Sequence, residues 1–190
     1  MTPTSRAVEE VDPRIDGGVL LRVARGAIAA RLRHEPASMI EDADWLRAPG
    51  ASFVTLTQAG ALRGCIGSLE AWRALGDDVR SNAVSAAIRD PRFRPLAPGE
   101  LEHTHIEVSV LTEPVPMPFA SYEDALAQLR AGVDGVILTR GPQRGTFLPQ
   151  VWEELPQPSA FIAHLLRKAG VSGWDDQVRL ARYQVVAFNE

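Results

Sequence analysis

A chain of 190 residues, 45% of them hydrophobic, is long enough to bury a core and suits one domain with two lobes. The formal net charge of -4 disfavours nonspecific binding to nucleic acid or to anionic membranes, since both attract an excess of positive charge. The single cysteine excludes an internal disulfide, and without an apolar leader or a long apolar run we expect a cytoplasmic protein with no membrane anchor.

The first expected element is an amphipathic helix. Residues 1–15 are polar and contain prolines, so we expect them to form an extension that precedes a single domain of residues 16–190. Apolar residues then recur at helical spacing from Leu20 to Leu32. Two β-rich runs follow in SFVTLTQAGALRGCIGSLE, and Ala59 and Gly60 between them predict a hairpin turn.

Helical and extended patterns then alternate. Helical spacing predicts a helix from Leu75 to Ile88 that stops before the prolines of DPRFRPL. The run HIEVSV alternates, so its apolar residues point one way and Glu107 and Ser109 the other.

The last third predicts two helices and further strands. Ser121 and Ser159 are expected N-caps of helices in SYEDALAQLRAG and SAFIAHLLRKAG. A hairpin is expected in DGVILTRGPQRGTFLP and one last strand in YQVVAF. Helices interspersed with hairpins, without repeated strand-helix-strand units, indicate an α+β fold with a mainly antiparallel sheet flanked by helices.

Cys65 is the most distinctive candidate for chemistry. On a strand, Arg63 and Cys65 of LRGCIG share a face, and a neighbouring guanidinium favours thiolate over thiol. Gly64 and Gly67 indicate a bulge or the close approach of another backbone or of a ligand. The alternative is a small packing residue, since free cysteine is commonly buried and no histidine lies nearby in sequence to act as its base.

Other polar residues also allow two interpretations. Glu107 could be a general base if its strand face lines a cleft, or an ordinary exterior residue if that face meets water. Asp90 and Arg92 could present arginine to an anionic ligand, or form a turn that ends a helix. His103 and His105 form an HxH pair on one expected strand face, but two ligands do not make a metal site, and we predict none.

Several motifs in order along the chain resemble the AMMECR domain family, whose bacterial and archaeal members are called AmmeMemoRadiSam system protein A. The motifs are FVTL (53–56), LRGCIG (62–67), DPRFRPL (90–96), IEVSVLTEP (106–114), DGVIL (134–138), GTFLPQVWEELP (145–156) and KAG (168–170). They cover most of the chain from the first helix onward, whereas residues 1–15 and the two histidines have no family counterpart.

The resemblance implies an AMMECR-type domain with a larger and a smaller subdomain and a cleft between them. It also implies that a set of polar or special positions gathers near that cleft: Arg63, Cys65, Gly67, Asp90, Arg92, Glu107, Ser109, Thr146 and Gln150. The family name further implies a shared modification pathway with a Memo-like protein and a radical SAM protein. It specifies neither the reaction nor a cofactor.

We therefore expect an enzyme or enzyme component that uses Cys65 as nucleophile or covalent carrier. Arg63 would stabilise the thiolate and Glu107 would transfer protons. A polar substrate would be bound by Thr146, Gln150 and backbone amides near Gly64. The alternative function is a non-catalytic module that binds a small ligand or a partner protein.

Overall fold

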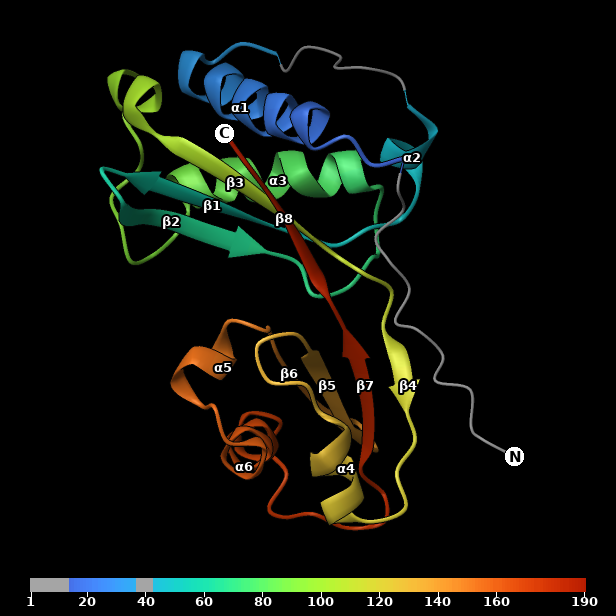
Figure 1. Cartoon of the computed structure of the whole chain (residues 1–190). Helices are drawn as coiled ribbons and strands as arrows, with labels where there is room; N and C mark the ends of the chain where they lie inside the picture. The colour runs from blue at the N-terminus through green and yellow to red at the C-terminus, as the bar shows by residue number, and fades with distance from the viewer. Residues whose placement is uncertain (1–13, 37–42) are drawn as a thin grey trace. The chain divides into compact units, whose positions relative to one another are not determined.

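Two four-stranded sheets organise the chain, each in its own compact unit (Figure 1). The computed structural model describes residues 14–36 and 43–190. The large unit contains residues 14–36, 43–111 and 186–190, and the small unit contains Thr112–Val185. The expected extension over residues 1–15 lies almost entirely outside the described residues. The mixture of helices and mainly antiparallel strands confirms the α+β prediction.

The large unit has a sheet with the strand order β2-β1-β3-β8. Its elements are α1 (Gly17–Arg33), α2 (Asp44–Arg47), β1 (Ser52–Gln58), β2 (Ala61–Gly67), α3 (Leu75–Ile88), the 3-10 helix η1 (Pro98–His103), β3 (His105–Leu111) and β8 (Val185–Asn189). Helix α1 begins after Asp16, whose carboxylate accepts a hydrogen bond from the Gly18 amide at 2.8 Å. The bounds of α3 match the predicted helix at both ends.

The two faces of this sheet have different environments. Val54, Leu56 and Ile106 are buried and join α1 and α3 in one hydrophobic core, so both helices pack on that face (Figure 1). Successive side chains alternate along a strand, so Thr55 and Glu107 lie on the opposite face and contribute nothing to that core. The alternation predicted for β3 is confirmed.

The turn between β1 and β2 is formed by Ala59 and Gly60, as predicted. Both residues have positive φ angles, 49° and 79°, which is the backbone conformation of a two-residue type I′ hairpin. Its twist suits adjacent antiparallel strands, and it places the LRGCIG motif on β2 at the edge of the sheet.

The small unit has the strand order β4-β7-β5-β6. Its elements are β4 (Val115–Met117), α4 (Tyr122–Gln128), β5 (Gly135–Arg140), β6 (Gln143–Phe147), α5 (Val151–Glu154), α6 (Pro158–Lys168) and β7 (Arg179–Tyr183). The Ser121 hydroxyl accepts a hydrogen bond from the Asp124 amide, which confirms that N-cap. The predicted Ser159 cap is wrong, because α6 already begins at Pro158, and proline suits the first helical position.

The single last strand expected in YQVVAF is instead divided between β7 and β8. At the break the Thr112 amide donates to the Gln184 carbonyl at 2.9 Å, and the Gln184 amide donates to the Thr112 hydroxyl at 2.8 Å. A threonine far away in sequence thus satisfies the backbone where the strand is interrupted. Over residues 14–36 and 43–190, none of the helices combines the length and apolar character needed to cross a bilayer.

Candidate functional site

Cys65 lies in a row of three half-buried side chains that crosses the face of the large unit's sheet opposite to α1 and α3. In the strand register, Thr55 of β1 is opposite Cys65 of β2 on one side and opposite Glu107 of β3 on the other. The Thr55 hydroxyl donates a hydrogen bond to the Cys65 Sγ atom at 3.4 Å. Neighbouring strands are about 4.8 Å apart, so Glu107 is anchored about 10 Å from the cysteine, across Thr55.

Asp90 and Arg92 fasten the outer edge of the strand that carries Cys65. The Asp90 Oδ2 atom accepts a hydrogen bond from the Cys65 amide at 2.8 Å, and Arg92 Nη2 donates to the Cys65 carbonyl at 3.2 Å. Arg92 also donates to both carboxylate oxygens of Asp90, at 2.9 and 2.7 Å. An edge strand exposes unpaired backbone groups, and this ion pair satisfies one residue of β2 as a further strand would.

The ion pair also sets the charge beside Cys65. The pKa of the Asp90 carboxyl is held well below its usual range, mainly by the Arg92 hydrogen bonds and also by the Cys65 amide, although burial opposes the shift. The pKa of Arg92 is raised, chiefly by its hydrogen bonds to Asp90. Arg92 is therefore a cation that Asp90 holds beside the backbone of Cys65.

Arg63, the predicted partner of the thiolate, makes its described contacts elsewhere. The β1–β2 register shifts between Leu56 and Thr57, so Arg63 has no residue opposite it on β1. Its guanidinium bonds the Glu100 carboxylate, at 3.3 and 3.2 Å, and the Arg94 carbonyl at 3.0 Å. No described hydrogen bond joins Arg63 to Cys65, and a role for Arg63 in thiolate chemistry stays a prediction.

The glycines on either side of Cys65 each face a close neighbour within the protein. A Cβ atom at Gly64 would overlap the carbonyl oxygen of Ala86 in α3, on the helix-covered face. A Cβ atom at Gly67 would overlap the ring of Phe53, its cross-strand partner on the face of Cys65. The close approach predicted from these glycines is therefore made by a helix and an aromatic ring, and a role in substrate binding stays a prediction.

Glu107, half-buried, and Ser109, buried, lie together on the sheet face opposite to α1 and α3, as the alternation in β3 predicted. The Ser109 hydroxyl donates a hydrogen bond to the Glu107 Oε1 atom at 3.1 Å. That bond orients one oxygen of the carboxylate. Among the described residues, none donates a hydrogen bond to the other oxygen, and a role for Glu107 in proton transfer stays a prediction.

Thr146 and Gln150 lie in the small unit. Thr146 is buried on β6, and its hydroxyl lies 3.2 Å from the Tyr183 hydroxyl, which also donates to the Phe147 carbonyl at 3.1 Å. Burial raises the pKa of Tyr183 to about 12. Gln150 is exposed at the start of α5. That either residue shares a site with Cys65 stays a prediction of the family resemblance.

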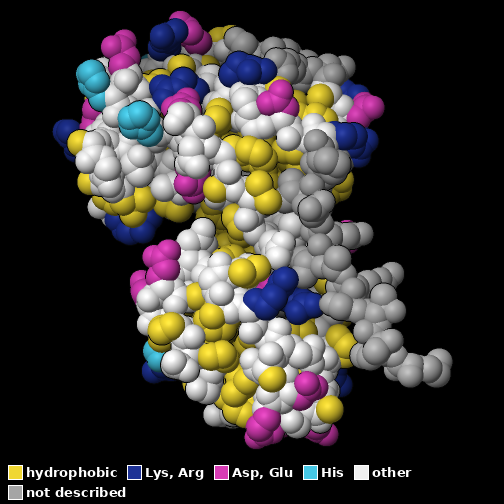
Figure 2. Space-filling view, in the orientation of Figure 1, with side chains coloured by type: hydrophobic (Ala, Val, Ile, Leu, Met, Phe, Trp, Pro, Cys, Tyr) yellow, Lys and Arg dark blue, Asp and Glu magenta, His cyan; other side chains and the backbone are white. Residues whose placement is uncertain are grey.

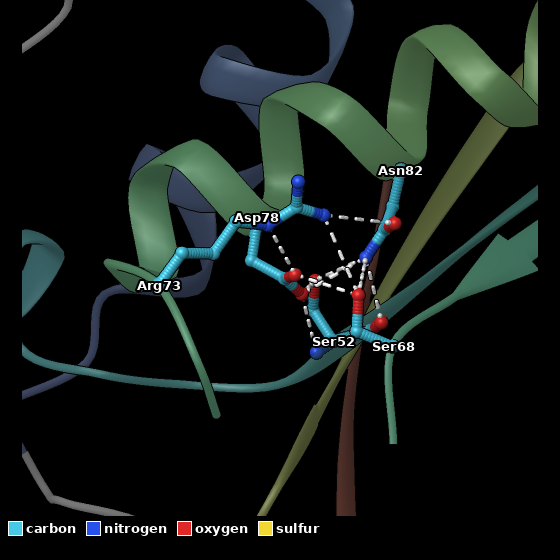
Figure 3. Close-up of polar contacts among 5 residues, drawn as sticks. All are labelled: Ser52, Ser68, Arg73, Asp78 and Asn82. Atoms are coloured by element: carbon cyan, nitrogen blue, oxygen red, sulfur yellow. Dashed lines mark hydrogen bonds and ion pairs between the residues drawn. The ribbon is translucent and has the colours of Figure 1, made fainter. Parts of the chain in front are cut away.

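A buried polar network in the large unit was not found from the sequence (Figure 3). Asp78 of α3 is fully buried, and its Oδ2 atom accepts from both the amide and the hydroxyl of Ser52, at 2.8 and 2.7 Å. Its Oδ1 atom accepts from the Ser68 hydroxyl and from Arg73 Nε, both at 2.7 Å. Asn82, one helical turn later, donates to Asp78 Oδ2 at 2.9 Å.

This network fastens the segment that follows β2. It links the start of β1, the segment from Ser68 to Arg73 and α3, and every oxygen of Asp78 is used (Figure 3). A charged residue beside the apolar positions Leu75 and Val79 of the predicted helix was the available signal, but the partners lie up to 26 residues away. We assign it a structural role, because the carboxylate has no vacant position for a ligand.

The two histidines do not share a strand face. His103 ends η1, whereas His105 begins β3. Among the residues that the structure describes, no group of three or more His, Cys, Asp or Glu side chains is placed to hold a metal ion.

The fold and this site together define a class: α+β proteins of two sheets in which one edge strand carries a cysteine beside a clamped ion pair. A model of the AMMECR1 family matches residues 21–188, and the chain belongs to that family. The match covers the motifs on which the resemblance rests.

Relatives of similar length share the whole domain. A protein of Methanothermobacter thermautotrophicus is 40% identical over 183 residues, which cover 93% of this chain and 95% of the relative. A protein of Aeropyrum pernix is 35% identical over 190 residues, with coverages of 96% and 81%. The crystal structure of uncharacterized protein PH0010 from Pyrococcus horikoshii has a TM-score of 0.75 and 30% identity, and the match covers 92% of this chain and 91% of that one.

Proposed function

We propose that the protein is an enzyme or enzyme component in which Cys65 reacts with a polar, electrophilic substrate as a nucleophile or covalent carrier. The most direct support is that the Thr55 hydroxyl donates a hydrogen bond to Cys65 Sγ. This contact lies on the sheet face that α1 and α3 do not cover. A hydrogen-bond donor and a nearby cation both favour the charged form of a thiol. A cysteine that only fills the core would need neither.

The neighbouring residues receive the following roles in this proposal. Arg92 supplies the cation and Asp90 holds it in place. Glu107, fixed by Ser109, moves protons on the substrate and not on the thiol, because about 10 Å separates their strands. Substrate contacts from the small unit, and the pathway with a Memo-like protein and a radical SAM protein, remain parts of the proposal supported only by the family resemblance.

The test is the rate at which iodoacetamide alkylates the native protein at neutral pH. The chain has one cysteine, so the whole signal reports Cys65. We expect faster alkylation in the native than in the denatured protein, and slower alkylation after Arg92→Gln or Thr55→Val. Arg89→Gln is the matched control, because Arg89 is an exposed arginine of the same segment with no hydrogen bond to Cys65.

Two results would count against the proposal. A thiol that reacts only after denaturation is a packing residue, and the binding-module alternative would then apply. If Arg92→Gln and Thr55→Val leave the alkylation rate unchanged, the described neighbours do not activate Cys65. Circular dichroism of each variant checks that the fold is retained.

A further inference from the structure

The small unit contains a pocket of about 830 Å³ that none of the predicted site residues lines. It lies between residues 116–121, which form the end of β4 and the segment to α4, and residues 174–180, which form the segment to β7 and the start of that strand. In Figure 2 the visible face of the small unit carries hydrophobic side chains beside acidic ones. The volume falls in the range of about 300–1,000 Å³ that is usual for small-molecule sites.

One side of the pocket is a fixed apolar wall. The Trp174 ring packs against Phe119 and Tyr122, with ring centroids 5.0 and 4.9 Å apart. Met117 and Leu180, opposite each other on β4 and β7, complete the wall and are 3% and 4% exposed. Such a surface, held in place by its own packing, suits a ring or another compact apolar group.

The polar rim contains an arginine with unused donors. Arg179 Nη1 donates to the Asp176 carbonyl at 2.7 Å and to the Val178 carbonyl at 2.8 Å, so the guanidinium is held in one orientation. Among the described residues, Nε and Nη2 of Arg179 make no hydrogen bond, and Arg179 joins no ion pair. The neighbouring Asp175 carboxylate is already taken by Arg140, whose Nε donates to it at 2.7 Å.

We infer that this pocket binds a small organic monoanion, a ring-bearing carboxylate whose apolar body lies on the Trp174 wall and whose carboxylate meets Arg179. A planar guanidinium presents parallel N–H groups that match a carboxylate. Asp176, also at the rim, disfavours anions of higher charge by repulsion. The site lies wholly within the small unit and is independent of Cys65.

The probe is 2-naphthoate, compared with the uncharged 2-naphthamide in ligand-observed NMR titrations of the full chain. We expect saturable binding of the carboxylate and clearly weaker binding of the amide. Arg179→Gln should weaken naphthoate binding about tenfold, the size expected for a hydrogen bond to a charged group. Arg167→Gln, an exposed arginine of α6 outside the pocket, is the matched control.

A second variant tests the pocket itself and removes no polar contact. Ala120 is exposed and lines the pocket, so Ala120→Phe should fill it and abolish naphthoate binding, whereas Ala131→Phe, outside it, should not. Cys65→Ser should leave binding unchanged, which separates this site from the proposed function. Equal binding of the two probes, insensitivity to Arg179→Gln or Ala120→Phe, or no saturation at millimolar probe would overturn the inference.

Discussion

Replacing Gly64 with alanine should destabilise the large unit strongly, because β2 and α3 touch at this position. An added Cβ atom would overlap the carbonyl oxygen of Ala86 and lie 3.1 Å from its carbonyl carbon. Both obstacles are backbone, so no side chain can rotate away, and α3 would have to retreat by about 1 Å. That helix contacts both α1 and the sheet in the core.

The magnitude follows from the cost of overpacking. Extra core atoms typically cost 1–3 kcal/mol, and a clash between two backbones belongs at the upper end, about 3 kcal/mol. For a chain of this size that corresponds to a fall in melting temperature of about 6–12 °C. Where a glycine has free space around it, its replacement by alanine should instead raise the stability slightly, because alanine lowers the conformational entropy of the unfolded chain.

The assay is thermal unfolding, with hydrogen exchange of peptides from β2 and α3 to assign the loss to the large unit. Gly99→Ala is the matched control, because an added Cβ atom there meets nothing within 4 Å. If Gly64→Ala melts within a degree or so of Gly99→Ala, α3 does not approach β2 as described.

Three further changes test individual contacts. Asp90→Asn should lower the free energy of unfolding by about 2–3 kcal/mol at neutral pH, because it weakens the buried ion pair with Arg92. Folding lowers the pKa of Asp90, so the difference in stability between variant and wild type should shrink below about pH 4 in urea titrations. A difference that stays constant with pH would contradict this. Asp78→Asn should cost about 3 kcal/mol or more in denaturant unfolding. The exposed Asp77→Asn should cost little, and equal losses would argue against the network. Tyr183→Phe should remove an ultraviolet titration step at about pH 12. The folded state retains the phenol proton, so the stability of the wild type should fall as the pH rises from about 10 to 12. A titration step already complete near pH 10 would count against the burial of Tyr183.

Short-range patterns predicted much of the fold. The helix Leu75–Ile88 was correct at both ends, because its spacing and the following proline are local signals. The Ala59 turn and the alternation of β3 are local in the same sense. Three-residue β4 and four-residue α5 were missed, because elements that short contain too little periodicity to detect.

The contacts of Cys65 depended on tertiary structure. The sequence placed Glu107 and Ser109 on one face of their strand, and only the strand register brings Cys65 and Glu107 to either side of Thr55. The sequence paired Cys65 with Arg63, two residues away, whereas Arg92, 27 residues away, contacts the cysteine's carbonyl. The register shift between Leu56 and Thr57 leaves Arg63 without a residue opposite it on β1, which the sequence pattern did not predict.

The sequence by itself determined the α+β class, the position of Cys65 on a strand and the alternating faces, since periodicity and turn chemistry act over a few residues. Only the tertiary structure decided that Asp90 closes the edge of β2, that Asp78 collects its donors from three segments, and that Trp174 and Arg179 line one pocket. Those contacts join residues that come together only when helices and strands pack, and packing depends on complementary shape over the whole unit.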